Sequence, residues 1–373
     1  MHIALISVAP PYRGGISKHS SILVENLKSK YNVDIINYTR QYPNFLFPGK
    51  TQYIDLNHDF GDRNIDSINP INWINTGRKI AKKKYDLVIF RFWNPFFAPA
   101  LGMIALQLKK KSPKSKLISL CDNIIPHENT FLGSFFTSYF LHKMHGHIVQ
   151  SSIVEKELHD IVKEPIFEKC FHPLYNCYLP KIDKKQARSI LGLKDKHIIL
   201  FFGIIRAYKG LDTLLKAISI LKNTMKDFHL IIVGECYENL DKYNEIIYKL
   251  GISEFITWYN EYIPDNDITK YFSAADIVTL PYRSASQSGI AQIAYNYDLP
   301  VIITNVGGLP EVVQEGKSGF IIEPENPKEL SNILEKKLNK KQLETMSNYI
   351  KEYKNHFSWK KFIYSIEKLY HRI

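Results

Sequence analysis

The stretch FFGIIRAYKGLDTLLKAI, residues 201–218, joins an apolar run to two cations and a helical pattern. The apolar run before Gly203 has the length of a buried strand. From Leu211 onward, apolar residues recur at the spacing of one helix face. Arg206 and Lys209 therefore lie between the carboxyl end of a predicted strand and the start of a predicted helix.

This placement of charge predicts an anion site. A helix start already carries a positive partial charge, so two cations beside it are unfavourable unless an anion binds there. A phosphate or diphosphate fits a loop at the carboxyl end of a strand. Solvated surface cations are the alternative, and the loop alone leaves both interpretations open.

The same alternation of strands and helices recurs along the chain and predicts a doubly wound α/β architecture. We predict strands at 3–8, 33–38, 87–93, 117–121, 147–151, 197–203, 228–235, 254–259, 276–282, 300–304 and 319–323. We predict helices at 17–29, 98–111, 134–145, 211–222, 241–250, 266–274 and 326–338.

The pattern restarts near residue 197, which predicts two domains. We place an N-terminal domain at 1–178, a C-terminal domain at 179–352 and a final helix at 353–373 that packs back on the first domain. Ligands of such folds bind at the carboxyl edges of parallel sheets, so we expect a cleft where the two edges face each other.

Composition narrows the class of protein. The 373 residues carry a net charge of +12, and the four cysteines form no CxxC pair. Scattered cysteines favour a reducing compartment, and no uncharged apolar stretch reaches the ~18 residues of a spanning helix. We therefore expect a cytoplasmic enzyme.

The positive charge has three interpretations. The run KKKSPKSK, 109–116, holds five lysines in eight residues. A solvated helix end is one reading, and attraction to anionic lipid headgroups is another. The apolar segment 129–144 is either a buried helix or part of such a membrane-docking surface. Nucleic acid is not expected as a partner, because no recognition motif accompanies the charge.

Two further loops have the character of phosphate sites. In PPYRGGISKHS, 10–20, Gly14 and Gly15 open a helix and leave backbone N–H groups available to an anion. This is not the GxGxxG pattern of a dinucleotide cofactor. In YRSASQSGIAQIAYN, 282–296, small residues lead into an apolar helix that begins at Ser288-Gly289.

These segments resemble a known family. GGISKHSSILVENL, FFGIIRAYKGLDTLLKAI, LIIVGE, ITWYNEYIPDNDITKYFSAADIVTLPY and LPVIITNVGGLPEVVQEGKSGFII, in that order, are similar to the retaining GT-B glycosyltransferases of family GT4. The resemblance spans nearly the whole chain and is strongest over 197–325. It implies the GT-B fold, with two Rossmann-like domains facing a cleft and a final helix crossing back to the first.

The resemblance also implies the chemistry. A nucleotide-diphosphate-sugar donor binds mainly to the second domain, a sugar or lipid-linked sugar acceptor binds to the first, and transfer needs no metal or other cofactor. Arg206 and Lys209 then hold the donor diphosphate and stabilise charge on the leaving group. The full set of donor-binding positions carried over is Gly14, Gly15, Gly203, Arg206, Lys209, Trp258, Gln287, Ser288, Gly289 and Ile290.

The sequence departs from the family at two places. The family usually carries two glutamates in the third loop, where this chain has Ala285 and Ile293. Gln287 and Gln292 lie close by but out of register.

The second departure follows the predicted strand at 117–121, where the family often has a histidine. Asp122 holds that place, and His127 follows five residues later. We predict both as catalytic residues that orient the acceptor or take its proton. Capping of the turn is the alternative for Asp122.

The predicted function is transfer of a hexosyl or N-acetylhexosaminyl group from a UDP- or GDP-sugar to a hydroxyl, in synthesis of a surface polysaccharide or glycolipid. We expect the enzyme in the cytoplasm or on the inner face of the cell membrane. A sugar phosphorylase and a non-catalytic nucleotide-sugar-binding protein remain open alternatives.

Overall fold

The computed structural model describes residues 1–43, 45, 47, 49, 51–54, 61–125, 131–193 and 196–373. The chain divides into two compact units, and each is described by itself. The first unit comprises Met1–His172 and Trp359–Ile373, and the second comprises Pro173–Ser358. Our predicted boundaries were 178/179 and 352/353. The last helix, α13 (Trp359–Arg372), belongs to the first unit.

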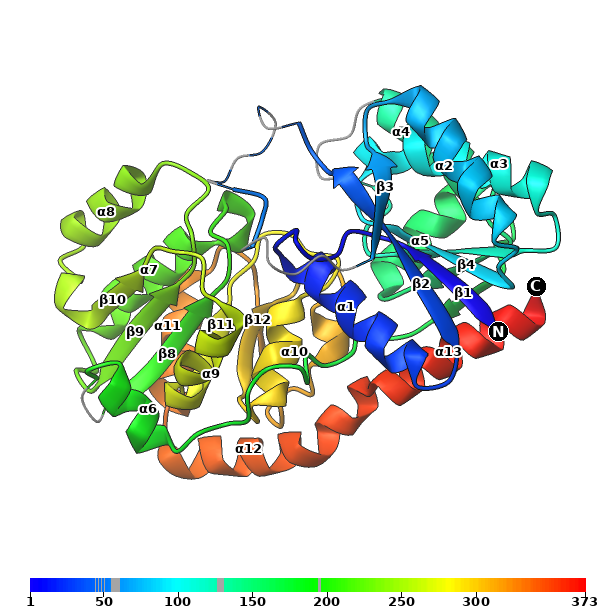
Figure 1. The fold of residues 1–373 in the computed structure, drawn as a ribbon. Helices are drawn as coiled ribbons and strands as arrows, with labels where there is room; N and C mark the ends of the chain where they lie inside the picture. Colours follow the sequence, from blue (N-terminus) through cyan, green and yellow to red (C-terminus); the bar gives the residue numbers. More distant parts are fainter. Residues whose placement is uncertain are drawn as a thin grey trace. The chain divides into compact units, whose positions relative to one another are not determined.

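The described residues of the first unit form a seven-stranded sheet in the order β3-β2-β1-β4-β5-β6-β7, with every neighbouring pair parallel. Figure 1 labels the strands β1 to β4 of this sheet. Its strands are β1 (His2–Ile6), β2 (Asn32–Arg40), β3 (Asp62–Asp66), β4 (Leu87–Phe92), β5 (Lys116–Cys121), β6 (Gly146–Val149) and β7 (Phe167–Lys169). The helices of this unit are α1 (Gly15–Lys28), α2 (Pro70–Lys82), α3 (Ala98–Lys111), α4 (Phe131–Leu141), α5 (Ser152–Ile161) and α13.

The second unit holds a six-stranded parallel sheet in the order β10-β9-β8-β11-β12-β13. Its strands are β8 (His197–Phe202), β9 (Phe228–Val233), β10 (Ile256–Tyr259), β11 (Ile277–Leu280), β12 (Val301–Thr304) and β13 (Gly319–Ile322). Its α-helices are α6 (Lys184–Ile190), α7 (Leu211–Leu221), α8 (Leu240–Lys249), α9 (Asp265–Ala274), α10 (Gly289–Asn296), α11 (Pro327–Lys337) and α12 (Lys340–Tyr353).

The predicted α/β fold is confirmed, although the strands β3 and β7 and the helices α2, α5, α6 and α12 were not predicted. β3 and β7 were not predicted, because DRNID and FEK are polar and short. Both lie at the edges of the first sheet. An edge strand needs little apolar surface, so it lacks the continuous apolar run that marks a buried parallel strand.

Local chemistry sets several helix starts. Asn69 precedes Pro70 at the start of α2, and its side chain accepts hydrogen bonds from two backbone N–H groups of the first turn. Asn326 and Pro327 hold the same positions at the start of α11, where the Asn326 side chain accepts one hydrogen bond, from the backbone N–H of Glu329. An Asn cap satisfies orphan N–H groups and proline at the first helical position has its φ already set, so each pair fixes the residue at which its helix begins.

The strand order creates one switch point in each sheet, where the chain turns from one direction of winding to the other. In the second sheet this point lies between β8 and β11, which are neighbours (Figure 1). Loops after such strands splay apart and leave room for a ligand. The loops predicted to hold phosphate in this unit, after Phe202 and after Leu280, are the two that leave this point.

Candidate active site

The cation loop, defined as residues 203–210, leaves β8 with an unusual backbone. Gly203 has φ +106°, and Gly210 has φ +67° at the point where α7 begins. A Cβ built on Gly210 would lie 2.0 Å from the carbonyl oxygen of Pro281. Only glycine allows that conformation at such a close approach. The cation loop therefore packs directly against the end of β11.

Lys209 is the buried cation of this loop. Its side chain is only 8% exposed, and its Nζ lies 5.7 Å from the ring centroid of Tyr282. Burial, together with the charge of Arg206, lowers the pKa of Lys209 to about 8. Within the part of the chain that the structure describes, no carboxylate pairs with Lys209. A buried ammonium without a counter-ion is costly, so this position favours an arriving anion.

Arg206 supplies the second cation and is exposed. Its guanidinium carbon lies 5.5 Å from the ring centroid of Tyr237. It forms no ion pair with a described acidic residue. The charge of Arg206 is close enough to Lys209 to contribute to the lowered lysine pKa. The positive charges of Arg206 and Lys209 therefore lie close enough together to attract the same anion.

The third predicted loop ends at α10. Ser288 is its N-cap, and the Ser288 Oγ accepts a hydrogen bond of 3.2 Å from the backbone N–H of Ile290. No acidic residue stands in the first turn of α10. A Cβ on Gly203 would lie 3.4 Å from Ile290 Cδ1 and 2.9 Å from the Lys209 Nζ, so the start of α10 and the lysine meet over Gly203. Buried cation and helix start thus combine their positive charge.

Gly289 and Gln287, two other residues predicted to bind the sugar donor, lie in the same loop. A Cβ on Gly289 would come within 3.0 Å of the Tyr175 ring, so α10 begins in close contact with that aromatic side chain. Gln287 directly precedes the Ser288 cap and is partly buried. The stretch Gln287–Ile290 therefore lies at the amino end of α10, as the sequence predicted.

Trp258 lies on β10, an edge strand of the second sheet, where it pairs with Ile232 of β9. Its ring stands 6.0 Å from that of Tyr243 on α8. The indole Nε1 is buried and donates to no described acceptor. Its predicted place beside a nucleotide base stays a prediction.

In the first unit, Gly14 is the N-cap of α1 and has φ +112°. A Cβ on Gly14 would meet nothing within 4 Å, and Gly15 is the first residue of the helix. The first turn of α1 has no acidic residue. The predicted glycine loop therefore forms the start of α1, where the absence of an acidic residue favours an anion.

Asp122 lies directly after β5 and is 5% exposed. Its Oδ2 accepts from Arg91 Nε at 2.7 Å, and its Oδ1 accepts from Arg91 Nη2 at 2.9 Å and from Gln150 Nε2 at 2.9 Å. A bidentate pair of this kind fixes geometry strongly. These contacts favour a positioning role over the proton transfer that the sequence suggested. His127, the second residue predicted to be catalytic here, lies outside the described residues.

Arg91 and His19 were missed by the sequence interpretation. Arg91 is 1% exposed, and its Nη1 lies 2.6 Å from Nδ1 of His19 on α1. Burial, followed by the nearby charge of Arg91, holds the pKa of His19 well below its usual value. A charged residue inside the apolar run LVIFRFW was the available signal, since a buried arginine requires partners.

Comparison with known proteins gives a consistent result. Residues 183–356 match the family described as Glycosyl transferases group 1. The whole chain is 25% identical to an uncharacterized glycosyltransferase of Methanocaldococcus jannaschii, covering 99% of it. Sucrose-phosphate synthase from Thermosynechococcus elongatus superposes with a TM-score of 0.79 at 19% identity, over 100% of this chain and 98% of that one. The chain is a glycosyltransferase of the GT-B fold.

A second solved structure extends the comparison of folds. HepE from Anabaena, solved in complex with UDP, has a TM-score of 0.77 at 15% identity, with full coverage of both chains. The family match falls on the second unit of the glycosyltransferase, which carries the cation loop and α10. The family's best-matched part is therefore the part in which the candidate phosphate site lies.

The structure shows where the residues that replace the family's two glutamates lie in the glycosyltransferase. The carbonyl oxygen of Ala285 lies against Gly307, where a Cβ would come within 1.6 Å. Ile293 is 4% exposed and packs inside the unit. Gln292 is 1% exposed, and its Oε1 accepts no hydrogen bond from a described donor. Neither Ala285 nor Ile293 offers an acceptor side chain for a sugar hydroxyl.

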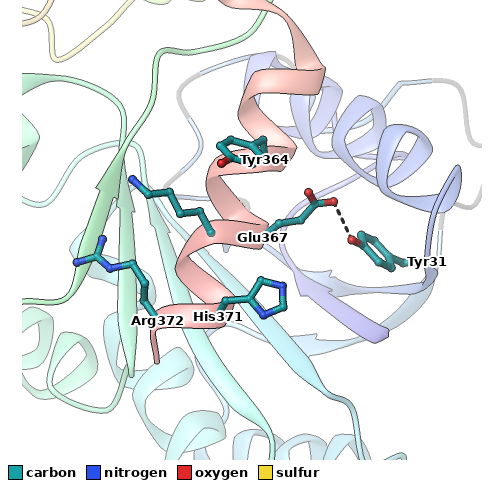
Figure 2. Close-up of a pocket in the computed structure, with 6 residues that line it drawn as sticks. Tyr31, Tyr364, Glu367, His371 and Arg372 are labelled. Carbon is teal, nitrogen blue, oxygen red and sulfur yellow. Dashed lines mark hydrogen bonds between the residues drawn. The ribbon is translucent and has the colours of Figure 1, made fainter.

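The first unit of the glycosyltransferase also carries a shallow pocket, drawn in Figure 2. Its lining residues are Tyr31, Tyr364, Glu367, Lys368, His371 and Arg372. The Tyr31 hydroxyl donates to Glu367 at 2.7 Å, while Lys368 and Arg372 pair with Glu168. Tyr31 and Glu367 bind each other, Lys368 and Arg372 are engaged by a carboxylate outside the lining, and no predicted site residue lines the pocket.

Proposed function

We propose that this glycosyltransferase is a retaining enzyme of the GT4 type that uses a UDP- or GDP-sugar. The observation that carries the proposal is the buried Lys209, which has no described carboxylate partner and lies against the start of α10. A diphosphate supplies the missing negative charge to the lysine, to Arg206 and to the helix start together. The UDP complex of HepE, a protein of the same fold, supports a uridine nucleotide as the first donor to test.

The chemistry follows from where negative charge grows. The bond between the anomeric carbon and the diphosphate oxygen breaks, and the bond between the acceptor oxygen and that carbon forms on the same face. The acceptor proton passes to the departing diphosphate. Lys209 and Arg206 stabilise the leaving group, so the charge that a metal ion supplies in other transferases comes from side chains.

The acceptor and the location form the finer part of the proposal. We infer a hydroxyl of a growing surface glycan, carried on a lipid, as the acceptor. Lys110, Lys111 and Lys114 are exposed, and Phe135 of α4 is 59% exposed. Lysines and an exposed aromatic residue favour contact with an anionic membrane surface. No helix among the described residues has the length and apolar character needed to cross a membrane.

The deciding experiment replaces both cations. Transfer from a panel of UDP- and GDP-sugars is measured by product detection, and nucleotide binding by calorimetry, for wild type and for Arg206→Ala/Lys209→Ala. We expect loss of both binding and transfer with an unchanged far-UV circular dichroism spectrum. Wild-type transfer by the double variant would show that the site is assigned wrongly. Product retaining the donor's anomeric configuration supports the retaining class, and inverted product contradicts it.

A further inference from the structure

Arg283 joins three parts of the second unit. Its Nη2 donates to Oδ2 of Asp212 at 2.7 Å, and its Nε donates to Oε1 of Glu325 at 2.8 Å. Its Nη1 donates to the backbone carbonyl of Ala207 in the cation loop. Asp212 stands in the first turn of α7, and Glu325 follows β13. One guanidinium therefore connects the loop after β8, the helix that follows that loop and the far edge of the sheet.

The backbone around Arg283 also contacts the cation loop. Its own N–H donates to the carbonyl of Tyr208 at 2.7 Å. Two residues earlier, the Pro281 carbonyl lies against Gly210. Between them, the Tyr282 ring lies 6.1 Å from the Tyr208 ring. The segment that leaves β11 thus supports the cation loop along its length.

The preceding peptide group, which carries the N–H of Ala207, is also held. Glu238 accepts a hydrogen bond from the backbone N–H of Ala207. The Tyr243 hydroxyl donates to the other oxygen of Glu238 at 2.8 Å. Ala207 stands between the two cations in sequence, and the peptide groups on both sides of its Cα are held, the carbonyl by Arg283 and the N–H by Glu238. Disorder at a residue between two phosphate-binding side chains displaces both of them, so it is expected to lower the binding affinity more than disorder elsewhere in the loop.

We propose that Arg283 is a positioning residue for the donor phosphate site. It contacts no substrate and instead holds the cation loop so that Arg206 and Lys209 face one anion. The inference rests on the proposed function, because it gives those two cations their ligand. Asp212 and Glu325 neutralise Arg283, so it adds no attraction of its own for a diphosphate. Its effect on binding comes through the loop alone.

This role has a consequence that a purely structural role lacks. The clamped loop keeps Lys209 buried, and burial is the main cause of its low pKa. Release of the loop hydrates the ammonium and returns its pKa toward the ordinary value of about 10.4. Loss of Arg283 must therefore weaken nucleotide binding at neutral pH and also move the pH at which binding declines.

The test compares Arg283→Gln with a matched control in the same unit. Arg188 donates to the Ala274 carbonyl at 3.1 Å and to Asp276 at 2.6 Å, so Arg188→Gln removes the same kinds of contact away from the loop. UDP and GDP binding is measured by calorimetry from pH 7 to 10. We expect Arg283→Gln to weaken binding about tenfold at pH 7.5, since displaced charges lose short-range attraction. Its decline with pH should shift upward by about one unit or more. Arg188→Gln should lower the melting temperature without either change.

A second readout separates this inference from the proposed function. The Lys209 resonance, assigned by comparison with Lys209→Met, is titrated by NMR in the unliganded wild type and in Arg283→Gln. A raised lysine pKa in the variant supports the positioning role even where neither nucleotide binds. An unchanged pKa overturns it, as does nucleotide binding equal to that of wild type. Should Arg283→Gln fail to fold, Asp212→Asn keeps the arginine and is expected to give a smaller shift in the same direction.

Discussion

The Lys209 Nζ lies against Gly203: a Cβ on that glycine would come within 2.9 Å of the ammonium nitrogen. The lysine side chain therefore folds back over the end of the strand from which its own loop departs. No other residue type at 203 leaves this space free. The contact explains why an apolar strand ends in glycine just before two cations.

Replacement of Gly203 by alanine should disturb both stability and binding. The φ of +106° strains an L residue, and the new methyl must displace the Lys209 ammonium. We expect a loss of about 1–3 kcal/mol in unfolding free energy and a severe loss of UDP or GDP binding. Gly192→Ala is the control, since that glycine has φ +65° and open space around it. Equal binding by the two variants would contradict the packing described.

Nucleotide binding should weaken in alkaline solution. The pKa of Lys209 in the free protein is about 8 and rises once a diphosphate is bound, so binding takes up a proton above that pH. Affinity is therefore full below pH 8 and falls as pH rises beyond it. Calorimetry from pH 6.5 to 9.5 in two buffers of different ionisation enthalpy measures both the affinity and the proton uptake. A flat affinity across this range would exclude Lys209 as the responsible group.

Removal of the Lys209 charge should stabilise the free protein. Its folded-state pKa is depressed, so the unfolded chain binds more protons between about pH 8 and 10.5 and stability rises with pH there. Lys209→Met should raise the unfolding free energy at pH 7 by roughly 1–3 kcal/mol, with the gain lost near pH 10.5. Urea unfolding at both pH values measures it, with exposed Lys216→Met as the control. Destabilisation at pH 7 would show that the ammonium is paired.

The Arg91–Asp122 pair should contribute strongly to the stability of the fold. Asp122→Ala leaves a buried guanidinium unpaired and is expected to cost about 3–5 kcal/mol of unfolding free energy. Lys249→Ala, which breaks an exposed pair with Glu245, should cost about 0.5 kcal/mol or less. An Asp122→Asn variant that keeps full stability and loses only transfer would restore the catalytic role that the sequence suggested.

Membrane contact is checked by sedimentation with lipid vesicles. Wild type should bind phosphatidylglycerol vesicles more strongly than phosphatidylcholine vesicles, and binding should fall with added salt. Lys110→Glu/Lys111→Glu should abolish the preference for anionic lipid, and Phe135→Ser should weaken binding to both. Equal binding of the charge variant and wild type would contradict membrane contact and would indicate that the lysine run is a solvated helix end.

Local pattern alone determined the alternating strands and helices of the second unit and the loop in which Arg206 and Lys209 lie. Those features depend on residues close in sequence: an apolar run, a glycine and a helical repeat. The resemblance to glycosyltransferases rested on the same local segments and is confirmed. Polar edge strands such as β3 escaped detection because nothing buries both of their faces.

The tertiary structure decided which charges have partners. Arg91 meets Asp122 across 31 residues of sequence, and Arg283 meets Ala207 across 76. Lys209 meets no described carboxylate at all. Pairing depends on which strands become neighbours in a sheet, and strand order is a long-range property that periodicity does not encode. For that reason the sequence pointed to an acidic catalyst at Asp122, whereas the fold pairs its carboxylate with a buried arginine and gives Lys209 no described carboxylate partner.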